Sequence, residues 1–221
     1  MARPTSGYKN AEGQRVPGTT TILGVFGDKG ALIYSANRLG LDGKNIRDEW
    51  YGKAANIGTL AHDLFEAHIL AEMGKPHTEP DQSVYTDEEV ETAHVAYGAA
   101  VEWLDQTNIR ILQTETPLVS EKYQFGGTPD AIGVDSKDRT VILDWKSGGV
   151  YGSALFQVAA YKLLVEECLN MKIEGFHVVR FAKETGDFVH RWYPELDKQA
   201  EAFPRMRELY TLLQETDKRA R

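Results

Sequence analysis

The stretch VILDWKSGG, residues Val141 to Gly149, places an acid and a base two positions apart at the end of an apolar run. The run TVILDWK is rich in β-branched and aromatic residues and ends at a Ser-Gly-Gly break, which predicts a buried strand over Thr140 to Lys146. Side chains alternate along a strand, so Asp144 and Lys146 should stand side by side on one face. Alone, such a pair is typical of a solvated ion pair that contributes roughly 0 to 1 kcal/mol. Its neighbours in the fold decide whether it does chemistry.

The composition is that of a globular protein. Of the 221 residues, 42% are hydrophobic, which is enough for one large domain with a sizeable core. No apolar run approaches the roughly 18 residues of a membrane span, and the opening MARPTSGYKN lacks the apolar core of a signal peptide. We therefore expect a cytoplasmic protein without membrane contact. The single cysteine, Cys168, excludes an internal disulfide and an all-cysteine metal site, and its helical surroundings LLVEECL predict a buried thiol.

The net charge of −8 comes from one segment. Between Leu60 and Glu91 there are nine acids and a single base, whereas the rest of the chain carries 24 acids and 24 bases. Other faces are therefore free to be locally basic, and the charge neither requires nor excludes a nucleic-acid partner. Cations and aromatic residues between Gly43 and Gly58 could clasp a nucleic-acid strand or form an ordinary helix surface. These candidate DNA-binding residues are Lys44, Arg47, Trp50, Tyr51 and Lys53.

The first half of the chain predicts an irregular arm over 1–18 and a mainly helical part over 19–108. A short apolar segment precedes a helix at about Ala31 to Leu39, and a longer helix covers GTLAHDLFEAHILAEMG. Another helix begins at Thr86, which has capping-box spacing to Glu89. In the longer helix, His62 and Glu66 share one flank, and the expected core stripe is Leu60, Leu64, Ala67 and Ala71.

Beyond residue 108 the pattern predicts a sheet core with a crossing helix over 109–193 and a C-terminal helix over 194–221. Ser153 is the expected N-cap of the crossing helix, which stacks Gln157 and Tyr161 four residues apart. GFHVVRF and DFVHRWY read as a hairpin, and the last helix, over Glu195 to Thr216, should kink or restart at Pro204 before a frayed tail. The first three strands form an antiparallel meander: Ile109–Val119, Tyr123–Val134 and Thr140–Lys146. These elements predict one α/β domain over 1–221, with a central mixed β-sheet flanked by helices.

A second acid joins the pair in the segment FGGTPDAIGVDS. Asp130 begins a strand there, and if that strand pairs with the one over Thr140 to Lys146, Asp130 and Asp144 converge. Two carboxylates about 4 Å apart repel by roughly 4 kcal/mol at an effective dielectric of 20, and a single lysine does not neutralise both. Glu115 on the preceding strand adds a third negative charge. A divalent cation would resolve this imbalance, and Mg²⁺ suits oxygen ligands better than zinc does.

Five motifs then occur together: GTLAHDLFE, the acid in QTETPLV, GGTPD, LDWK and QVAAY. In this order and context the sequence resembles the PD-(D/E)XK nuclease superfamily, and most of all its RecB-like exonuclease branch. The resemblance runs from about Thr20 to Tyr161, and the opening TTTILGVFGDKGALI is similar to phage members. It implies a restriction-endonuclease-like core with an N-terminal helical elaboration. Relatives that hold an iron-sulfur cluster need four cysteines, so this chain departs from them.

The resemblance also implies a role for each motif residue. The metal ligands are His62, Asp130, Asp144 and the backbone carbonyl of Trp145, and Lys146 positions or activates the attacking water. Glu115 matches an acid near the metal, and Gln157 and Tyr161 match the motif that flanks the cleavable phosphate. Independently, Glu66 is better placed to orient the His62 ring than to bind a metal. The other histidines show no ligand spacing and are interpreted as surface or packing residues: His68, His77, His94, His177 and His190.

The resemblance implies a Mg²⁺-dependent DNA exonuclease, with Mn²⁺ as a substitute ion, that leaves 5′-phosphates. The expected substrate is DNA with free ends, in phage or bacterial recombination, repair or processing, with a recombination or single-strand-binding protein as a partner. Two alternatives stay open. One is a structure-specific endonuclease with the same site, and the other is a nucleic-acid-binding subunit that has the fold without turnover.

Overall fold

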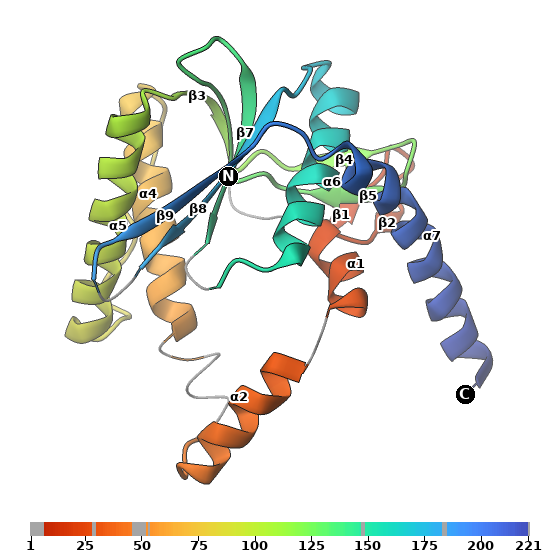
Figure 1. Cartoon of the computed structure of the whole chain (residues 1–221), viewed down its shortest axis with the longest axis horizontal. Helices are drawn as coiled ribbons and strands as arrows, with labels where there is room; N and C mark the ends of the chain where they lie inside the picture. Colours follow the sequence, from red (N-terminus) through yellow and green to blue (C-terminus); the bar gives the residue numbers. More distant parts are fainter. Residues whose placement is uncertain are drawn as a thin grey trace.

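A five-stranded mixed sheet forms the centre of the molecule (Figure 1). The computed structural model describes residues 7–27, 30–45, 52, 54–146, 149–182 and 185–220. The strand order is β3-β6-β7-β8-β9; β7 and β8 are parallel, and the other neighbours are antiparallel. This order confirms the predicted α/β class with a central mixed sheet. The strands are β3 (Arg110–Thr114), β6 (Ala131–Val134), β7 (Thr140–Lys146), β8 (Gly175–Phe181) and β9 (Phe188–Tyr193).

Helices cover both faces of the sheet, α4 and α5 on one and α6, α7 and α1 on the other (Figure 1). The predicted alternation along β7 is confirmed, because Val141, Leu143 and Trp145 belong to the core under α4 and α5. Ile142 belongs to the core on the opposite face. The helices are α1 (Thr19–Phe26), α2 (Gly30–Leu41), α4 (Ala54–Glu72), α5 (Asp87–Thr107), α6 (Gly152–Leu169) and α7 (Asp197–Ala220).

The start of α5 has the predicted capping box. Glu89 N donates to Thr86 Oγ1 over 3.3 Å, and Thr86 N donates to Glu89 Oε2 over 2.8 Å. Glu89 also accepts from Asn56 Nδ2 over 2.9 Å, which ties α5 to α4. The α4 stripe is buried as expected except at Ala71, which is exposed.

Two of the predicted strands are wrong in extent. The segments Ile109–Val119 and Tyr123–Val134 each break into two, and their outer halves form a separate antiparallel pair, β4 (Leu118–Ser120) and β5 (Phe125–Gly127). The first break lies at Glu115, whose φ of 44° is left-handed and cannot continue a strand. The second lies at Pro129, which has no N–H to donate to a ladder.

The N-terminal part is more regular than predicted. Residues 7–18, expected as an irregular arm, include a short hairpin of β1 (Tyr8–Lys9) and β2 (Arg15–Val16). The apolar segment after it is helix α1. Such two-residue strands leave no periodic signal in a sequence.

Three smaller expectations are also wrong. The N-cap of α6 is Tyr151, so Ser153 lies inside the first turn. The thiol of Cys168 is exposed, because the α6 helix turns this position away from the core; its Sγ donates to Val119 O. Helix α7 continues through Pro204 to Ala220, so it does not restart at the proline and the tail is helical rather than frayed. Among the described residues, no helix is long and apolar enough to span a membrane.

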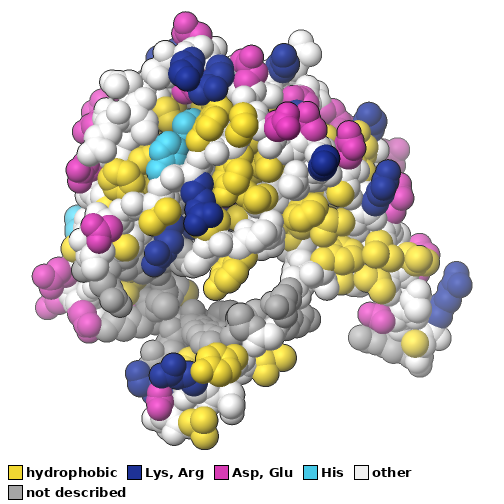
Figure 2. Space-filling model, in the orientation of Figure 1, with side chains coloured by type: hydrophobic (Ala, Val, Ile, Leu, Met, Phe, Trp, Pro, Cys, Tyr) yellow, Lys and Arg dark blue, Asp and Glu magenta, His cyan; other side chains and the backbone are white. Residues whose placement is uncertain are grey.

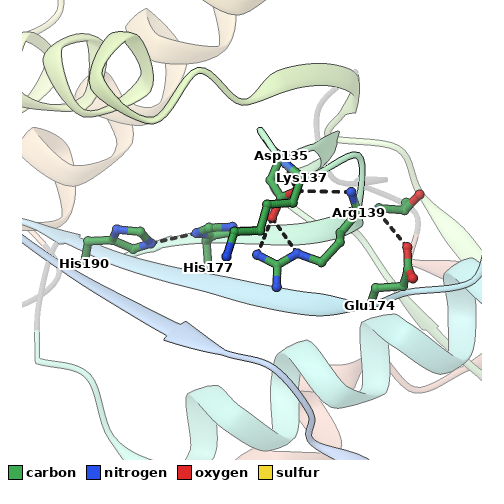
Figure 3. A network of polar contacts seen from close by, with 7 residues as sticks. Asp135, Lys137, Arg139, Glu174, His177 and His190 are labelled. Carbon is green, nitrogen blue, oxygen red and sulfur yellow. Dashed lines mark hydrogen bonds and ion pairs between the residues drawn. The ribbon is translucent and has the colours of Figure 1, made fainter.

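A network of polar side chains lies around the turn between β6 and β7 and on the neighbouring strands β8 and β9 (Figure 3). His177 on β8 is 6% exposed, and its Nδ1 lies 2.6 Å from His190 Nε2 on β9. Arg139 binds Asp135 Oδ2 through Nε (2.9 Å) and a terminal nitrogen (2.6 Å). Burial, and secondarily the neighbouring His190, lowers the pKa of His177 to about 4. The expectation of a packing histidine is therefore met at His177.

The His177 pKa predicts a loss of stability in acid. Because the folded pKa lies below the ordinary value of about 6.5, this group contributes stability above pH 6.5 that is lost as the pH falls toward 4. We expect the free energy of unfolding to fall more for the wild type than for His177→Leu between pH 7 and pH 4.5. Urea denaturation at several pH values measures this difference. The control His94→Leu, at an exposed position on α5, should retain the wild-type slope; an equal slope in His177→Leu would contradict the prediction.

Two glycine substitutions should act in opposite directions. A methyl group on Gly175 would overlap the Trp192 ring, so Gly175→Ala should lower the free energy of unfolding by about 1–3 kcal/mol. Gly98 is exposed in the interior of α5 with open space around its Cα, so Gly98→Ala should raise it by roughly 0.5–1 kcal/mol. Thermal and urea denaturation of both variants give the sign of each change.

Candidate active site

Three neighbouring strands bring acids to one end of the sheet. Glu115 follows β3, Asp130 precedes β6, and Asp144 lies near the end of β7. The register pairs Thr114 with Ala131 and Ala131 with Leu143, which places the three acids across adjacent positions. Glu115 N donates to the backbone oxygen of Asp130 over 3.1 Å. The predicted convergence of these carboxylates therefore follows from the antiparallel pairing.

His62 joins this end of the sheet from helix α4. One ligand atom each from His62, Glu115 and Asp130 lies within 4.8 Å of the others. The helix is held against the sheet here, because Phe65 packs edge-on against Trp145 with ring centroids 5.0 Å apart. An imidazole nitrogen and two carboxylate oxygens at this spacing could share a metal ion.

The predicted contact between Asp144 and Lys146 is present. Lys146 Nζ donates to Asp144 Oδ1 over 2.9 Å and lies 2.7 Å from Oδ2. Asp144 is 0% exposed, and this burial raises the pKa of its carboxyl to about 6. The Lys146 charge opposes that rise, whereas the nearby negative charge of Asp130 adds to it. Asp144 is therefore costly to ionise in the free protein and would gain from a further positive charge.

The buried oxygen Asp144 Oδ2 is the clearest sign of what the site could hold. Its contact with Lys146 lacks hydrogen-bond geometry, and no other described residue donates to it. Buried carboxylate oxygens normally have a partner, so an unfilled acceptor beside clustered acids suits a cation. The donor set is rich in oxygen with one imidazole, which fits Mg²⁺ or Mn²⁺.

A chain of polar side chains connects the lysine to helix α6. Lys146 Nζ donates to Gln157 Oε1 over 3.1 Å, and Gln157 Nε2 donates to Tyr161 OH over 2.8 Å. The predicted i, i+4 arrangement on α6 is therefore present, and both side chains are buried. Lys146 is held from two sides, by Asp144 on its own strand and by Gln157 from the helix.

Asp130 is fixed by the backbone of the next strand. It is 4% exposed, and its Oδ2 accepts from Trp145 N over 2.7 Å.

The role of the Trp145 carbonyl as a metal ligand and the role of Glu66 beside His62 stay predictions. Of the candidate DNA-binding residues, Lys44 is described in the loop after α2, and the other four (Arg47, Trp50, Tyr51 and Lys53) lie outside the described residues.

Several residues beside the site were not predicted from the sequence. A cleft of about 310 Å³ opens next to Tyr161, between the N-terminal hairpin and the start of α1. Tyr8, Arg15, Thr19 and Gly127 line it, and the adjacent pair Gly126-Gly127 was the only sequence signal of a close approach here.

The strand order and the cluster of acids with one lysine define the core of a nuclease. The chain belongs to the PD-(D/E)XK nuclease superfamily, whose family model matches residues 34–220. This match confirms the superfamily inferred from the sequence motifs. A search of curated proteins found no match.

Solved structures with a similar arrangement include a candidate exonuclease from Eubacterium rectale, 16% identical with a TM-score of 0.44. The match covers 71% of this chain and 64% of that protein, so the chain spans under two thirds of its length. Another is the alkaline exonuclease LHK-Exo from Laribacter hongkongensis, 11% identical with a TM-score of 0.33. The complex of LHK-Exo with dAMP gives 12% and 0.35, and both of its structures cover 79% of this chain and 100% of that one. Likeness at this level gives no information about substrate.

The polar chain on α6 can be tested by stability. Gln157→Met keeps the length of the side chain but removes the amide, so the buried Tyr161 hydroxyl and Lys146 each lose a partner. We expect the free energy of unfolding to fall by about 1–3 kcal/mol, because two hydrogen bonds of a buried side chain are lost. Urea denaturation checks this, with Gln106→Met on the surface of α5 as the control. Equal stability of both variants would contradict the described contacts.

Proposed function

We propose that this protein is a divalent-metal-dependent DNA exonuclease that leaves 5′-phosphates. The observation that supports this most is the buried Asp144–Lys146 pair beside the donor cluster of His62, Glu115 and Asp130. Membership of the superfamily supports hydrolysis of a phosphodiester bond. The exonuclease mode, the DNA substrate and the product follow the sequence resemblance.

In this proposal His62, Asp130 and Asp144 hold Mg²⁺, and the Trp145 carbonyl is a backbone ligand. Glu115 lies near the ion, within reach of His62 and Asp130, and Glu66 orients the His62 ring. Mn²⁺ substitutes for Mg²⁺. When bound, the ion draws charge from the phosphodiester and lowers the pKa of a nearby water. The fit rests on three carboxylates against one lysine and on the unfilled acceptor Asp144 Oδ2.

Lys146 is placed to handle the attacking water. Its Nζ has three hydrogens, and Asp144 and Gln157 account for two of them. The remaining hydrogen and the positive charge can orient the nucleophile or offset charge that develops on the phosphate. Gln157 and Tyr161 keep the amine in this position from the α6 side and flank the phosphate.

The DNA would approach from the side of the cleft beside Tyr161, whose volume of about 310 Å³ is that of a small ligand pocket. In the view of Figure 2, lysine and arginine side chains are scattered among acids rather than gathered in one basic area. Lys44, Arg47, Trp50, Tyr51 and Lys53 are therefore proposed to supply further contacts to the strand. The biological setting would be phage or bacterial recombination, repair or DNA processing, on free ends and beside a recombination or single-strand-binding protein.

The test compares linear duplex, linear single-stranded and covalently closed circular DNA, each end-labelled or stained, in Mg²⁺, Mn²⁺ or EDTA. We expect loss of the linear substrates only, with no loss in EDTA, and 5′-phosphate on the released nucleotides. Cleavage of closed circles would show an endonuclease with the same site. Binding of DNA without hydrolysis in any metal would show a silent binding subunit.

Two variants connect the activity to the site. Asp144→Asn removes a charge from the donor set and Lys146→Ala removes the amine, so each should lower the rate at least about a hundredfold. Circular dichroism should show both variants folded. Mn²⁺ should raise the melting temperature of the wild type and not that of Asp144→Asn, because only a ligand bound to the folded state stabilises it. Glu121→Gln, an exposed acid away from the cluster, is the control, and wild-type rates in both site variants would overturn the assignment.

A further inference from the structure

The segment FGGTPD, residues Phe125 to Asp130, comprises β5 and the loop that leads to β6. The N-terminal hairpin contacts this segment. Tyr8 of β1 places its hydroxyl 2.9 Å from Thr128 Oγ1, although the two residues are 120 positions apart. Thr128 is 1% exposed and Tyr8 is half-buried, so the Thr128 side of this hydrogen bond is buried. Thr128 lies two residues before Asp130, which contributes a ligand atom to the donor cluster.

The two glycines of this loop let the N-terminal segment come close. A methyl group on Gly126 would overlap the Tyr8 ring, and one on Gly127 would lie 2.8 Å from Thr19 Oγ1. Gly126 N donates to Pro17 O, and Gly126 O accepts from Thr19 Oγ1, both over 3.0 Å. The segment from Tyr8 to Thr19 therefore contacts Phe125–Asp130 through backbone hydrogen bonds, an aromatic ring and a hydroxyl group.

Between β5 and β6, Thr128 and Pro129 have no place in a strand ladder, whereas Asp130 is hydrogen-bonded to neighbouring strands. β5 ends at Gly127 and β6 begins at Ala131, so the residues between them lie outside both strand ladders. Asp130 is anchored on its far side by Trp145 N and through its backbone oxygen by Glu115 N. Pro129 fixes one of the few torsions between Thr128 and Asp130. With Thr128 held by Tyr8, the Asp130 carboxylate has little freedom to turn away from His62 and Glu115.

We propose that Tyr8 is a positioning residue, which holds Asp130 in metal-binding geometry through Thr128. The matched family residues begin at 34, so this contact comes from outside that match. The inference rests on the proposed metal-dependent function. Its chemical basis is that groups which orient a metal ligand affect metal affinity without touching the metal.

The experiment measures Mn²⁺ binding to the full chain by calorimetry and, separately, the Mg²⁺ dependence of DNA hydrolysis. Tyr8→Phe keeps the ring against Gly126 and removes only the hydroxyl, and Thr128→Val removes the other partner. Each should weaken Mn²⁺ binding about tenfold, the low end for residues that orient ligands, and raise the Mg²⁺ concentration for half-maximal rate by the same factor. The double variant should be no weaker than either single variant, because one hydrogen bond is lost in all three. Thr128→Ser retains the hydroxyl and should bind metal as the wild type does.

A purely structural role would lower thermal stability without moving metal affinity. The rate at saturating Mg²⁺ and the KM for DNA should stay within about twofold of the wild type in Tyr8→Phe. The control Tyr97→Phe removes a comparable long-range phenol contact, to His68 Nδ1 at 3.3 Å, and should leave metal binding unchanged. Wild-type Mn²⁺ affinity in Tyr8→Phe and Thr128→Val overturns the positioning role alone. Absence of metal binding and hydrolysis in the wild type overturns the proposed function and this inference with it.

Discussion

A fully buried carboxylate in the central strand is the constraint on which the site depends. Asp144 has no solvent exposure, and Lys146 on the same strand forms an ion pair with it. A buried ion pair rarely stabilises a fold as much as apolar residues of the same size would, since desolvation offsets the attraction. Retaining the pair therefore costs the fold stability that a Leu or Val would supply. Function is the reason that fits the cost, because a nearby cation would turn the same charge into a ligand.

The site depends on both cores of the molecule. Trp145 and Phe65 pack on the side of α4 and α5, and that packing brings His62 to the end of the sheet. Asp144 and Lys146 face the other side, where Gln157 and Tyr161 of α6 meet them. Because side chains alternate along β7, one strand supplies the packing that holds α4 and the charges that meet α6. Loosening either layer would therefore separate the imidazole from the amine.

The sequence predicted features that depend on local patterns and missed those that depend on contacts between distant residues. The buried strand over β7 and the pairing of Asp144 with Lys146 depend on period-two alternation, which is local and strong. The break at Glu115 was missed although the run QTETP around it is polar and ends in a proline; the φ of 44° at Glu115 shows the turn directly. The contact of Tyr8 with Thr128 joins residues 120 positions apart, so no local pattern could indicate it. The glycine pair at 126 and 127 leaves room for Tyr8 and Thr19, but two adjacent glycines in a sequence do not specify which segment approaches.

The charges of the site also connect ligand binding with folding. Glu115 and Asp130 come together, with Asp144 beside Asp130, only when β3, β6 and β7 pair, and the unfolded chain has no such cluster. Burial raises the Asp144 pKa by removing water from the carboxylate, and the negative charge of Asp130 adds to that rise, so ionised acids oppose the last step of the pairing. A cation that binds the assembled cluster and not the separated acids would reverse this term and stabilise the folded state by mass action. Clustering these acids lowers the free energy of unfolding of the free protein. A bound ion would therefore stabilise this end of the sheet.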